Sequence, residues 1–243
     1  MALLEVTGLS KRFGGFVALE GIDLAVLEGE RVGLIGPNGS GKSTLVNCIC
    51  GTLTNETGSV HFDGQPMDGL LTHERTRRGV ARSFQLPRPF VTLTVADNLR
   101  VPLLYTVNAR AGSSLKSADI HARCAELLQL VGLAEKAAKL PRDLTQVEMR
   151  KLELARAMAA EPKLLIADES MAGLSQSEVD DIVALLIRLN ERGITIVLIE
   201  HIMRAVMEFS QRLAVLVAGR KIADGDPKVV VRDPEVVRAY LGE

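Results

Sequence analysis

The spacing with the clearest chemistry in this chain is a G-x-x-x-x-G-K-[ST] pattern. It is completed by Gly36, Pro37, Asn38, Gly39, Ser40, Gly41, Lys42, Ser43 and Thr44. An apolar stretch of strand length precedes it and an apolar helical stretch follows, which is the context that a phosphate-binding loop requires. Glycine lets the backbone curl so that its N–H groups point at a polyphosphate, and the helix adds the positive end of its dipole. Lys42 would reach the β- and γ-phosphates and Ser43 would bind Mg²⁺, so the spacing predicts a nucleoside triphosphate site.

Two carboxylates end another apolar strand, which we expect over residues 163–167. Asp168 and Glu169 follow that strand directly, and ligands of open parallel sheets bind at the carboxyl ends of the strands. Asp168 therefore suits Mg²⁺, held through its water shell, and Glu169 suits polarising an attacking water. Solvated acids at a strand end are the alternative for this segment alone, but a phosphate loop in the same chain favours the functional interpretation.

A histidine, His201, ends a further buried strand that we expect over residues 194–199. In an open parallel sheet this strand end faces the same way as the end that carries Asp168 and Glu169. An imidazole there can hydrogen-bond a γ-phosphate and hold the water-activating glutamate in place. A lone histidine is more often an ordinary polar residue, and that alternative stays open from the sequence.

The elements that must position these residues alternate between strand and helix, which predicts a parallel sheet in an α/β protein. Strands are expected at 3–8, 18–26, 58–63, 163–167, 194–199 and as a pair around 213–223, and helices at 149–160, 176–192 and 202–209. Between about 94 and 140 the pattern is helical, with a loop over 108–117. The chain length of 243 residues fits one large domain with a smaller lobe.

Composition excludes some classes of protein. The formal net charge is -1 and aromatic residues are few, so nucleic acid is not expected as a partner. No apolar run approaches the ~20 residues that span a bilayer, and the N-terminus lacks the pattern of a signal peptide. The sequence therefore predicts a cytosolic protein. Cys48, Cys50 and Cys124 have no metal or redox spacing and are expected in or near the core.

Taken in order, these motifs resemble the nucleotide-binding subunit of an ABC (ATP-binding cassette) transporter over essentially the whole chain. The order is the phosphate loop, Arg82-Ser83-Phe84-Gln85, a helical region, Leu144–Ala157, Asp168-Glu169 and His201. The resemblance implies an α/β phosphate-loop cassette with a mostly parallel core sheet, an N-terminal antiparallel β-subdomain and a helical lobe. It implies one cassette domain over 1–243, with 1–93 and 158–243 as catalytic core and 94–157 as helical lobe.

The resemblance also implies roles for individual residues. Gln85 would be the glutamine that contacts Mg²⁺ or the attacking water and moves with the helical lobe. Phe13 would be the aromatic residue that stacks on adenine, although a minor core position is the alternative. The implied activity is ATP hydrolysis, with Ser43, Gln85 and Asp168 at Mg²⁺ and Glu169, His201 and Gln85 as catalytic residues.

Further details resemble the subgroup that serves branched-chain amino acid uptake. They are the start Lys11-Arg12-Phe13-Gly14-Gly15, the segments Ala172-Gly173-Leu174 and Ile199-Glu200-His201, and the C-terminal run 236–243. The resemblance implies an ATPase subunit that powers an importer for branched-chain amino acids or related small polar solutes. It would sit peripherally at the cytoplasmic face of the membrane, with permease subunits, a second ABC ATPase subunit and, indirectly, a solute-binding protein as partners.

The signature sequence departs from the family pattern Leu-Ser-Gly-Gly-Gln. The helix that follows fixes the register, so the signature positions are Leu144, Thr145, Gln146, Val147 and Glu148. In the family this loop approaches the γ-phosphate of ATP bound to the other subunit. Gln146 and Val147 would crowd that approach, and Glu148 would either add negative charge or face away. Ser175 is a second departure, because the family commonly has aspartate there.

These departures predict an asymmetric pair in which this chain joins a different cassette. The composite site that uses Thr145–Glu148 would then bind ATP and turn over slowly, while the other site hydrolyses it. The alternative is a tolerated local variant with two working sites. At the level of function class, the alternatives are a soluble non-transport ABC ATPase and a phosphate-loop GTPase or kinase. A single cassette without heptad repeats or base-specific GTPase motifs disfavours both.

Overall fold

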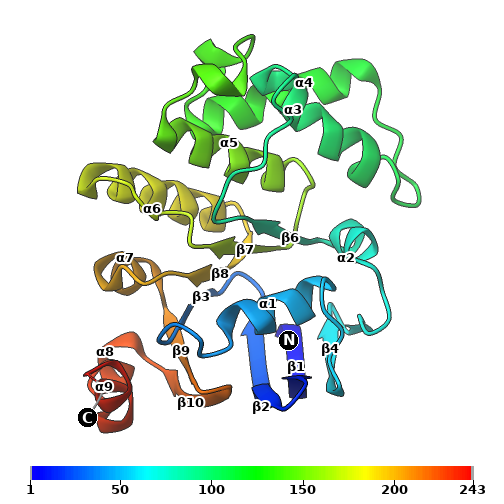
Figure 1. The fold of residues 1–243 in the computed structure, drawn as a ribbon. Coiled ribbons are helices and arrows are strands. Elements are labelled where there is room, and N and C mark those ends of the chain that lie inside the picture. The colour runs from blue at the N-terminus through cyan, green and yellow to red at the C-terminus, as the bar shows by residue number, and fades with distance from the viewer. Residues whose placement is uncertain (1, 242–243) are drawn as a thin grey trace.

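Two β-sheets and a helix that packs against both position the phosphate loop and the residues at the strand ends (Figure 1). The computed structural model describes residues 2–241. The antiparallel sheet has the order β2-β1-β4-β5, from β1 (Ala2–Phe13), β2 (Phe16–Leu27), β4 (Thr57–Phe62) and β5 (Gln65–Pro66). The larger sheet has the order β10-β9-β3-β8-β7-β6, from β3 (Arg31–Ile35), β6 (Val80–Ser83), β7 (Leu164–Asp168), β8 (Thr195–Ile199), β9 (Arg212–Val217) and β10 (Arg220–Gly225). In that sheet only β10 pairs antiparallel.

The residue pattern of each strand follows from what covers it. The strands β7 and β8 are buried along their whole length, because helices cover one face and the antiparallel sheet with α1 covers the other. In β1, Leu4 and Val6 are buried while Glu5 and Thr7 are exposed, as expected for a sheet with one solvated face. The α/β class and the mostly parallel sheet predicted from the sequence are therefore confirmed.

Helices flank the larger sheet and form a separate layer at the top of Figure 1. This layer contains α3 (Val95–Pro102), the π-helical turn η1 (Leu103–Val107), α4 (Ser117–Val131), the short turns η2 (Ala134–Lys136) and η3 (Pro141–Asp143), and α5 (Gln146–Met158). The remaining helices are α1 (Lys42–Cys50), α2 (Thr72–Arg78), α6 (Gln176–Glu191), α7 (Met203–Phe209), α8 (Pro227–Val230) and α9 (Pro234–Leu241). Within residues 2–241, none of these helices is long and apolar enough to cross a membrane.

One hydrophobic cluster continues from the helical layer to the larger sheet. It joins Leu99 of α3 and Leu128 of α4 to Leu165 of β7 and Leu198 of β8. A second cluster fills the space between α1 and the two sheets and contains Cys48 and Cys50. All three cysteines are buried, so their predicted core position is confirmed.

Several predicted boundaries are wrong. The β1 and β2 strands extend to a tight turn at Gly14-Gly15, and α5 begins at residue 146 rather than 149. The strand β6 and the helices α8 and α9 were not predicted. The parallel pairing of β7 with β8, which brings the ends that carry Asp168 and His201 to one edge, is confirmed.

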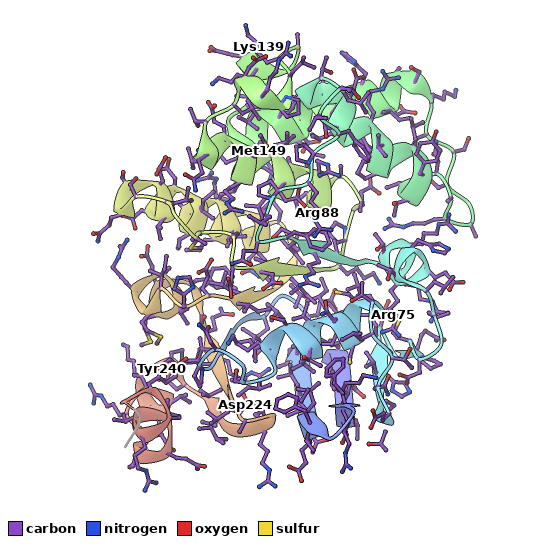
Figure 2. The ribbon with its side chains drawn as sticks, viewed as in Figure 1. Arg75, Arg88, Lys139, Met149, Asp224 and Tyr240 are labelled. Carbon is purple, nitrogen blue, oxygen red and sulfur yellow. The ribbon has the colours of Figure 1, made fainter. Side chains whose placement is uncertain are left out.

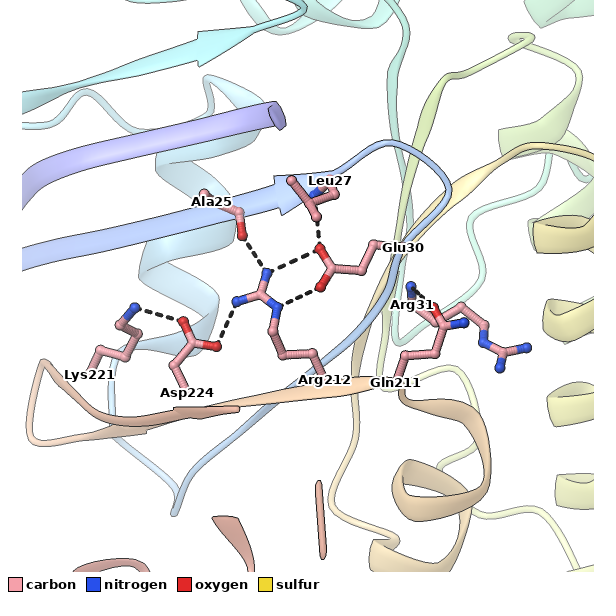
Figure 3. Close-up of polar contacts among 8 residues, drawn as sticks. All are labelled: Ala25, Leu27, Glu30, Arg31, Gln211, Arg212, Lys221 and Asp224. Carbon is pink, nitrogen blue, oxygen red and sulfur yellow. Dashed lines mark hydrogen bonds and ion pairs between the residues drawn. The ribbon is translucent and has the colours of Figure 1, made fainter. Parts of the chain in front are cut away.

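A cluster of charged side chains centred on Arg212 ties the two sheets together (Figure 3). From β9, the Arg212 guanidinium bonds both carboxylate oxygens of Glu30, the Asp224 carboxylate of β10 and the Ala25 carbonyl oxygen of β2. Glu30 in turn accepts a hydrogen bond from the Leu27 amide at 2.8 Å. These hydrogen bonds hold β2 against β9 and β10 of the larger sheet, close to where β3 begins.

Candidate active site

The phosphate loop lies between β3 and α1, as the sequence predicts. Gly36 has a φ of 153°, and a Cβ there would lie 2.0 Å from the Leu216 carbonyl oxygen, so only glycine fits. The Lys42 ammonium folds back over the loop, where it donates to the carbonyl oxygens of Gly36 at 2.7 Å and Pro37 at 3.0 Å. Partial burial lowers the pKa of Lys42, and the nearby carboxylates of Glu169 and Asp168 oppose that shift. The loop therefore presents one cation and several backbone N–H groups.

A cavity of about 230 Å³ opens over this loop. It is lined by Phe13, Phe16, Ala18, Glu169 and the loop residues Asn38, Gly39, Ser40, Gly41, Lys42, Ser43 and Thr44. The Phe13 ring is 47% exposed, and the Lys11 ammonium lies 5.6 Å from its centroid. Phe13 is thus a surface aromatic at the cavity wall and not a core residue.

Phe16 is a cavity residue that the sequence reasoning missed. It is paired with Phe13 across the turn at Gly14-Gly15, and 62% of it is exposed. A Gly-Gly pair between two alternating segments is a signal for a tight hairpin, which places the flanking residues opposite each other. The two rings therefore form an apolar wall beside the phosphate loop.

Asp168 ends β7 and is held in an ion pair. Arg82 of β6 donates through Nε to Asp168 Oδ2 at 3.1 Å and through Nη1 to Asn47 Oδ1 of α1 at 2.7 Å. Both hydrogen bonds from Arg82 to Asp168 are made to Oδ2. Arg82 thus ties the Asp168 carboxylate to the helix that follows the phosphate loop.

Glu169 stands at the edge of the cavity in a strained backbone conformation. Its φ is 45°, in the left-handed region, and its amide donates to the Ile199 carbonyl oxygen at 2.9 Å. The Gln85 side-chain amide donates to Glu169 Oε2. The structure therefore brings Glu169 and Gln85 together next to the phosphate loop.

His201 follows β8 at the same edge of the sheet, but its side chain is 67% exposed. Its Nδ1 lies 3.8 Å from Glu200 Oε2. The cavity lining includes Glu169 but none of Gln85, Asp168 and His201. Of the predicted catalytic residues, Glu169 is half-buried, whereas Gln85 and His201 are exposed to solvent.

The signature positions form the start of α5. Thr145 is the N-cap, and its hydroxyl accepts from the Glu148 amide at 3.4 Å while the Glu148 carboxylate accepts from the Thr145 amide at 2.8 Å. The Lys136 ammonium donates to the same carboxylate at 2.7 Å, and this bond lowers the pKa of Glu148. The sequence allowed Glu148 either to add negative charge near the phosphates or to face away. In the structure its carboxylate is paired with Lys136 of the same chain.

The other signature side chains also make contacts within the chain. Val147 packs against the hydrophobic cluster of the helical layer. The Gln146 amide reaches the Ala172 carbonyl oxygen at 3.5 Å, in the loop after Glu169. Ser175 caps α6 and donates its hydroxyl to the Glu178 carboxylate at 2.7 Å. The side chains that depart from the family pattern therefore all make packing contacts or hydrogen bonds within this chain.

No cluster of three or more His, Cys, Asp or Glu side chains suited to a metal occurs in residues 2–241. Of the predicted Mg²⁺ ligands, Ser43 lines the cavity, Gln85 donates to the cavity residue Glu169, and Asp168 directly precedes Glu169. Such a mixed set suits a cation that also binds the phosphates of a nucleotide.

Comparison with known proteins identifies the chain. The ABC transporter family model matches residues 19–172, and a model described as branched-chain amino acid ATP-binding cassette transporter matches residues 220–243. The chain is 38% identical to the high-affinity branched-chain amino acid transport ATP-binding protein BraF of Pseudomonas aeruginosa, over 99% of this chain and 98% of BraF. It is also 38% identical to LivG of Escherichia coli, a protein of the same description, with the same coverage.

Solved structures agree with this assignment. The ADP conformation of an ATP-binding cassette of an ABC transporter superimposes with a TM-score of 0.89 and 31% identity, and covers all of both chains. A nucleotide-free ATP-binding cassette superimposes with a TM-score of 0.87, also at 31% identity and full coverage. The chain therefore belongs to the ABC transporter family, whose ATP-binding cassettes are the ATPase subunits of transporters.

Proposed function

We propose that this chain binds and hydrolyses ATP to power an importer for branched-chain amino acids or related small polar solutes. The observation that carries the proposal is the match of residues 220–243 to a segment described for branched-chain amino acid cassettes, beside full-length similarity to BraF and LivG. That C-terminal segment includes β10 and α9, which lie outside the region that matches the general family model. The match of this segment is therefore evidence for the branched-chain amino acid subgroup that does not depend on the phosphate loop.

The nucleotide would lie in the cavity over the phosphate loop. Phe13 offers a flat exposed ring for adenine, and stacking of this kind tolerates any base. The loop N–H groups and Lys42 would take the phosphates. Lys42 now bonds to carbonyl oxygens of its own loop, so ATP would exchange those bonds for stronger ones to phosphate oxygens.

Oxygen donors near the loop fit Mg²⁺, which prefers oxygen ligands. Ser43 would offer its hydroxyl, Asp168 its carboxylate and Gln85 its amide oxygen. When bound, Mg²⁺ would neutralise charge on the β- and γ-phosphates. Because Arg82 uses only Oδ2 of Asp168, the ion pair leaves Oδ1 for a water of the metal shell.

Glu169 is proposed to polarise the water that attacks the γ-phosphate. Gln85 holds the Glu169 carboxylate through its amide, which orients one carboxylate oxygen and leaves the other for water. His201 would contact the γ-phosphate, and its exposed ring is free of the core packing that would prevent such a movement.

By analogy with the family, the signature of each cassette would complete the ATP site of a second cassette, so hydrolysis would need a pair. We propose a different chain as this partner. The Thr145–Glu148 signature lacks both family glycines, and the site that it completes would bind ATP but turn over slowly. Lys136 neutralises Glu148, so the side chain of Gln146 at the first turn of α5 would be the main obstacle. Replacing Gln146 and Val147 by glycine tests this: unchanged hydrolysis by the assembled pair would contradict it.

Membrane subunits are proposed to dock at a groove between the core and the helical layer. This groove of about 300 Å³ is lined in part by Phe84, Phe90, Val101, Tyr105 and Arg156. Tyr105, Phe84 and Phe90 are all exposed in this one groove, and such an apolar patch fits a partner surface. Docking there would place the chain at the cytoplasmic face of the membrane and move residues 94–157 as a lobe against 1–93 and 158–243. A solute-binding protein would act only through the permease.

The proposal is tested by ATP hydrolysis of the purified chain, alone and mixed with candidate second cassettes. Glu169→Gln should abolish turnover and retain ATP binding, while Glu191→Gln, at the exposed end of α6, is the matched control. Uptake of labelled leucine by vesicles that contain the full transporter should fail with the same variant. Robust hydrolysis by this chain alone would reject the asymmetric pair, and activity that survives Glu169→Gln would reject the assigned site.

A further inference from the structure

The loop after Glu169 runs through Ser170, Met171 and Ala172 to Gly173 before α6 begins. It connects the carboxylate that faces the phosphate loop to the segment around Ser175. Ser170 and Met171 are buried, although the loop has no regular structure. Buried irregular backbone needs bonding partners for its N–H and C=O groups. Two of the loop's hydrogen bonds are local, from the Ala172 amide to Glu169 and from the Leu174 amide to Met171, and the other partners come from two distant parts of the chain.

The first partner is Glu200, at the end of β8 and directly before His201. The Glu200 side chain is fully buried, and its Oε1 accepts a hydrogen bond from the Met171 amide at 2.8 Å. The preceding residue, Ile199, accepts from the Glu169 amide at 2.9 Å. Two successive residues at the end of β8 therefore hold two positions of the loop, one on each side of Ser170.

The second partner is Arg150 of α5, which is also buried. Its Nη2 donates to the Ala172 carbonyl oxygen at 3.2 Å, and the Gln146 amide approaches the same oxygen at 3.5 Å. The buried Arg150 side chain thus donates to the Ala172 carbonyl oxygen, while the buried Glu200 side chain accepts from the amide of the neighbouring residue, Met171. Opposite charges on the two sides suit the peptide dipoles between them, and hydrogen bonds to charged groups are the stronger kind.

Burial disfavours the charged form of both side chains and raises the pKa of Glu200. Burial lowers the pKa of Arg150, and the Glu200 carboxylate opposes that shift. Two Arg150 nitrogens and Glu200 Oε2 are buried without a hydrogen-bond partner among the described residues. Because a lone buried charge is costly, removing one of the two leaves the other in an unfavourable environment.

The strained backbone of Glu169 depends on the contacts that hold this loop. A glutamate with a φ of 45° keeps that conformation only when its surroundings impose it. The loop that follows is the part of the surroundings that Arg150 and Glu200 hold. If the loop relaxed, the Glu169 carboxylate would move relative to the phosphate loop, and small displacements of a catalytic group slow a reaction strongly.

We propose that Arg150 and Glu200 are positioning residues that clamp the loop after Glu169, so that the signature helix α5 and the strand before His201 together fix the Glu169 carboxylate. This inference rests on the proposed role of Glu169 in ATP hydrolysis. The clamp links three segments that the reaction needs at once: the start of α5, the loop toward Ser175 and the end of β8.

The test compares Arg150→Met and Glu200→Gln with Lys151→Met and Glu191→Gln as matched controls, in the assembled ATPase pair. Lys151 is the neighbour of Arg150 and makes only a longer surface contact to Asp181 at 3.6 Å. We expect each clamp variant to lower kcat about tenfold or more, as for displaced catalytic groups. KM and the Kd for ATP without turnover should change less than about twofold, because the phosphate loop is untouched. Arg150→Lys should recover part of the rate.

The double variant Arg150→Met with Glu200→Gln separates a clamp from two independent effects. A shared clamp predicts a combined loss smaller than the product of the single losses, since coupled residues are not additive. Unchanged kcat in both single variants, with Glu169→Gln still inactive, would overturn the clamp and leave the proposed function standing. Equal losses in kcat and ATP affinity together with a lower Tm would also overturn it, because they would show a merely structural role. Activity that survives Glu169→Gln would overturn the proposed function itself.

Discussion

Arg212 offers a sharp test of how the two sheets are held together. Replacing it by methionine keeps much of the aliphatic stem but removes four hydrogen bonds, two to Glu30, one to Asp224 and one to Ala25. Asp224 keeps Lys221 as a partner at 2.7 Å (Figure 3). Glu30 loses its main partner with a side chain only 13% exposed. The variant should therefore be less stable chiefly because of the Glu30 carboxylate.

The magnitude follows from the burial of that carboxylate. Hydrogen bonds to charged groups contribute about 1.5–3 kcal/mol each when buried, and partial exposure reduces this toward the ~0–1 kcal/mol of surface pairs. For a pair with side chains 24% and 13% exposed we expect a loss of about 2–4 kcal/mol in the free energy of unfolding. For a chain of this size that lowers Tm by roughly 5–12 °C.

The assay is thermal and urea unfolding of the purified chain, with Arg220→Met as control. Arg220 pairs with Glu20 at 2.9 Å, but the two side chains are 66% and 52% exposed. Because solvent screens this exposed pair, its replacement should change the free energy of unfolding far less than that of Arg212. Equal losses for the two variants would refute the reasoning, because the same kind of ion pair would then contribute regardless of burial.

Three further perturbations have definite outcomes. Arg75, labelled in Figure 2, is buried, and its guanidinium donates to the carbonyl oxygens of Cys48 and Ile49 in α1 and of Leu70 before α2. Arg75→Met should therefore lower the free energy of unfolding by about 2–4 kcal/mol in urea titrations. An equal effect of Arg77→Met, at an exposed position of α2, would contradict this. Glu148→Gln should be less stable than the parent at neutral pH. Because Lys136 lowers the pKa of Glu148, this stabilisation is present above the ordinary carboxyl value of 4.5 and is lost as the pH falls through the lowered value, so the two unfolding curves should converge in acid. Phe13→Ala should weaken ATP binding about 5- to 100-fold in equilibrium titrations, the range for loss of one stacked base, and an unchanged Kd would remove Phe13 from the site.

The phosphate loop and the strand ends were predictable because their patterns are local. The loop motif fixes its own context, and the apolar runs before Asp168 and His201 are long enough to be recognised as buried strands. Parallel pairing then brings the two ends to one edge, as the register of Asp168 with Ile199 confirms. Neither step needs information from distant parts of the chain.

Other features were not predicted because their local sequence pattern fits more than one structure or depends on tertiary contacts. Thr145 and Glu148 were considered as signature positions, yet their spacing is also that of a capping box, which is why α5 begins earlier than expected. The strand β6 contains Arg82, so its sequence is not an apolar run, and only the tertiary contact with Asp168 explains a charge there. The clamp from Arg150 and Glu200 joins residues far apart in sequence and has no local signal.

The burial of the three cysteines has a practical consequence for spectroscopy. Cys48, Cys50 and Cys124 all lie in the core, and burial raises the pKa of each thiol, that of Cys50 to about 11. Thiol-reactive labels attack the thiolate and need access, so the folded chain should leave its native cysteines unmodified. A single cysteine introduced at the exposed Ser114, in the loop before α4, would then carry a fluorophore or spin label without first removing the native three. Distances between labelled cassettes could follow the opening and closing of the assembled pair directly.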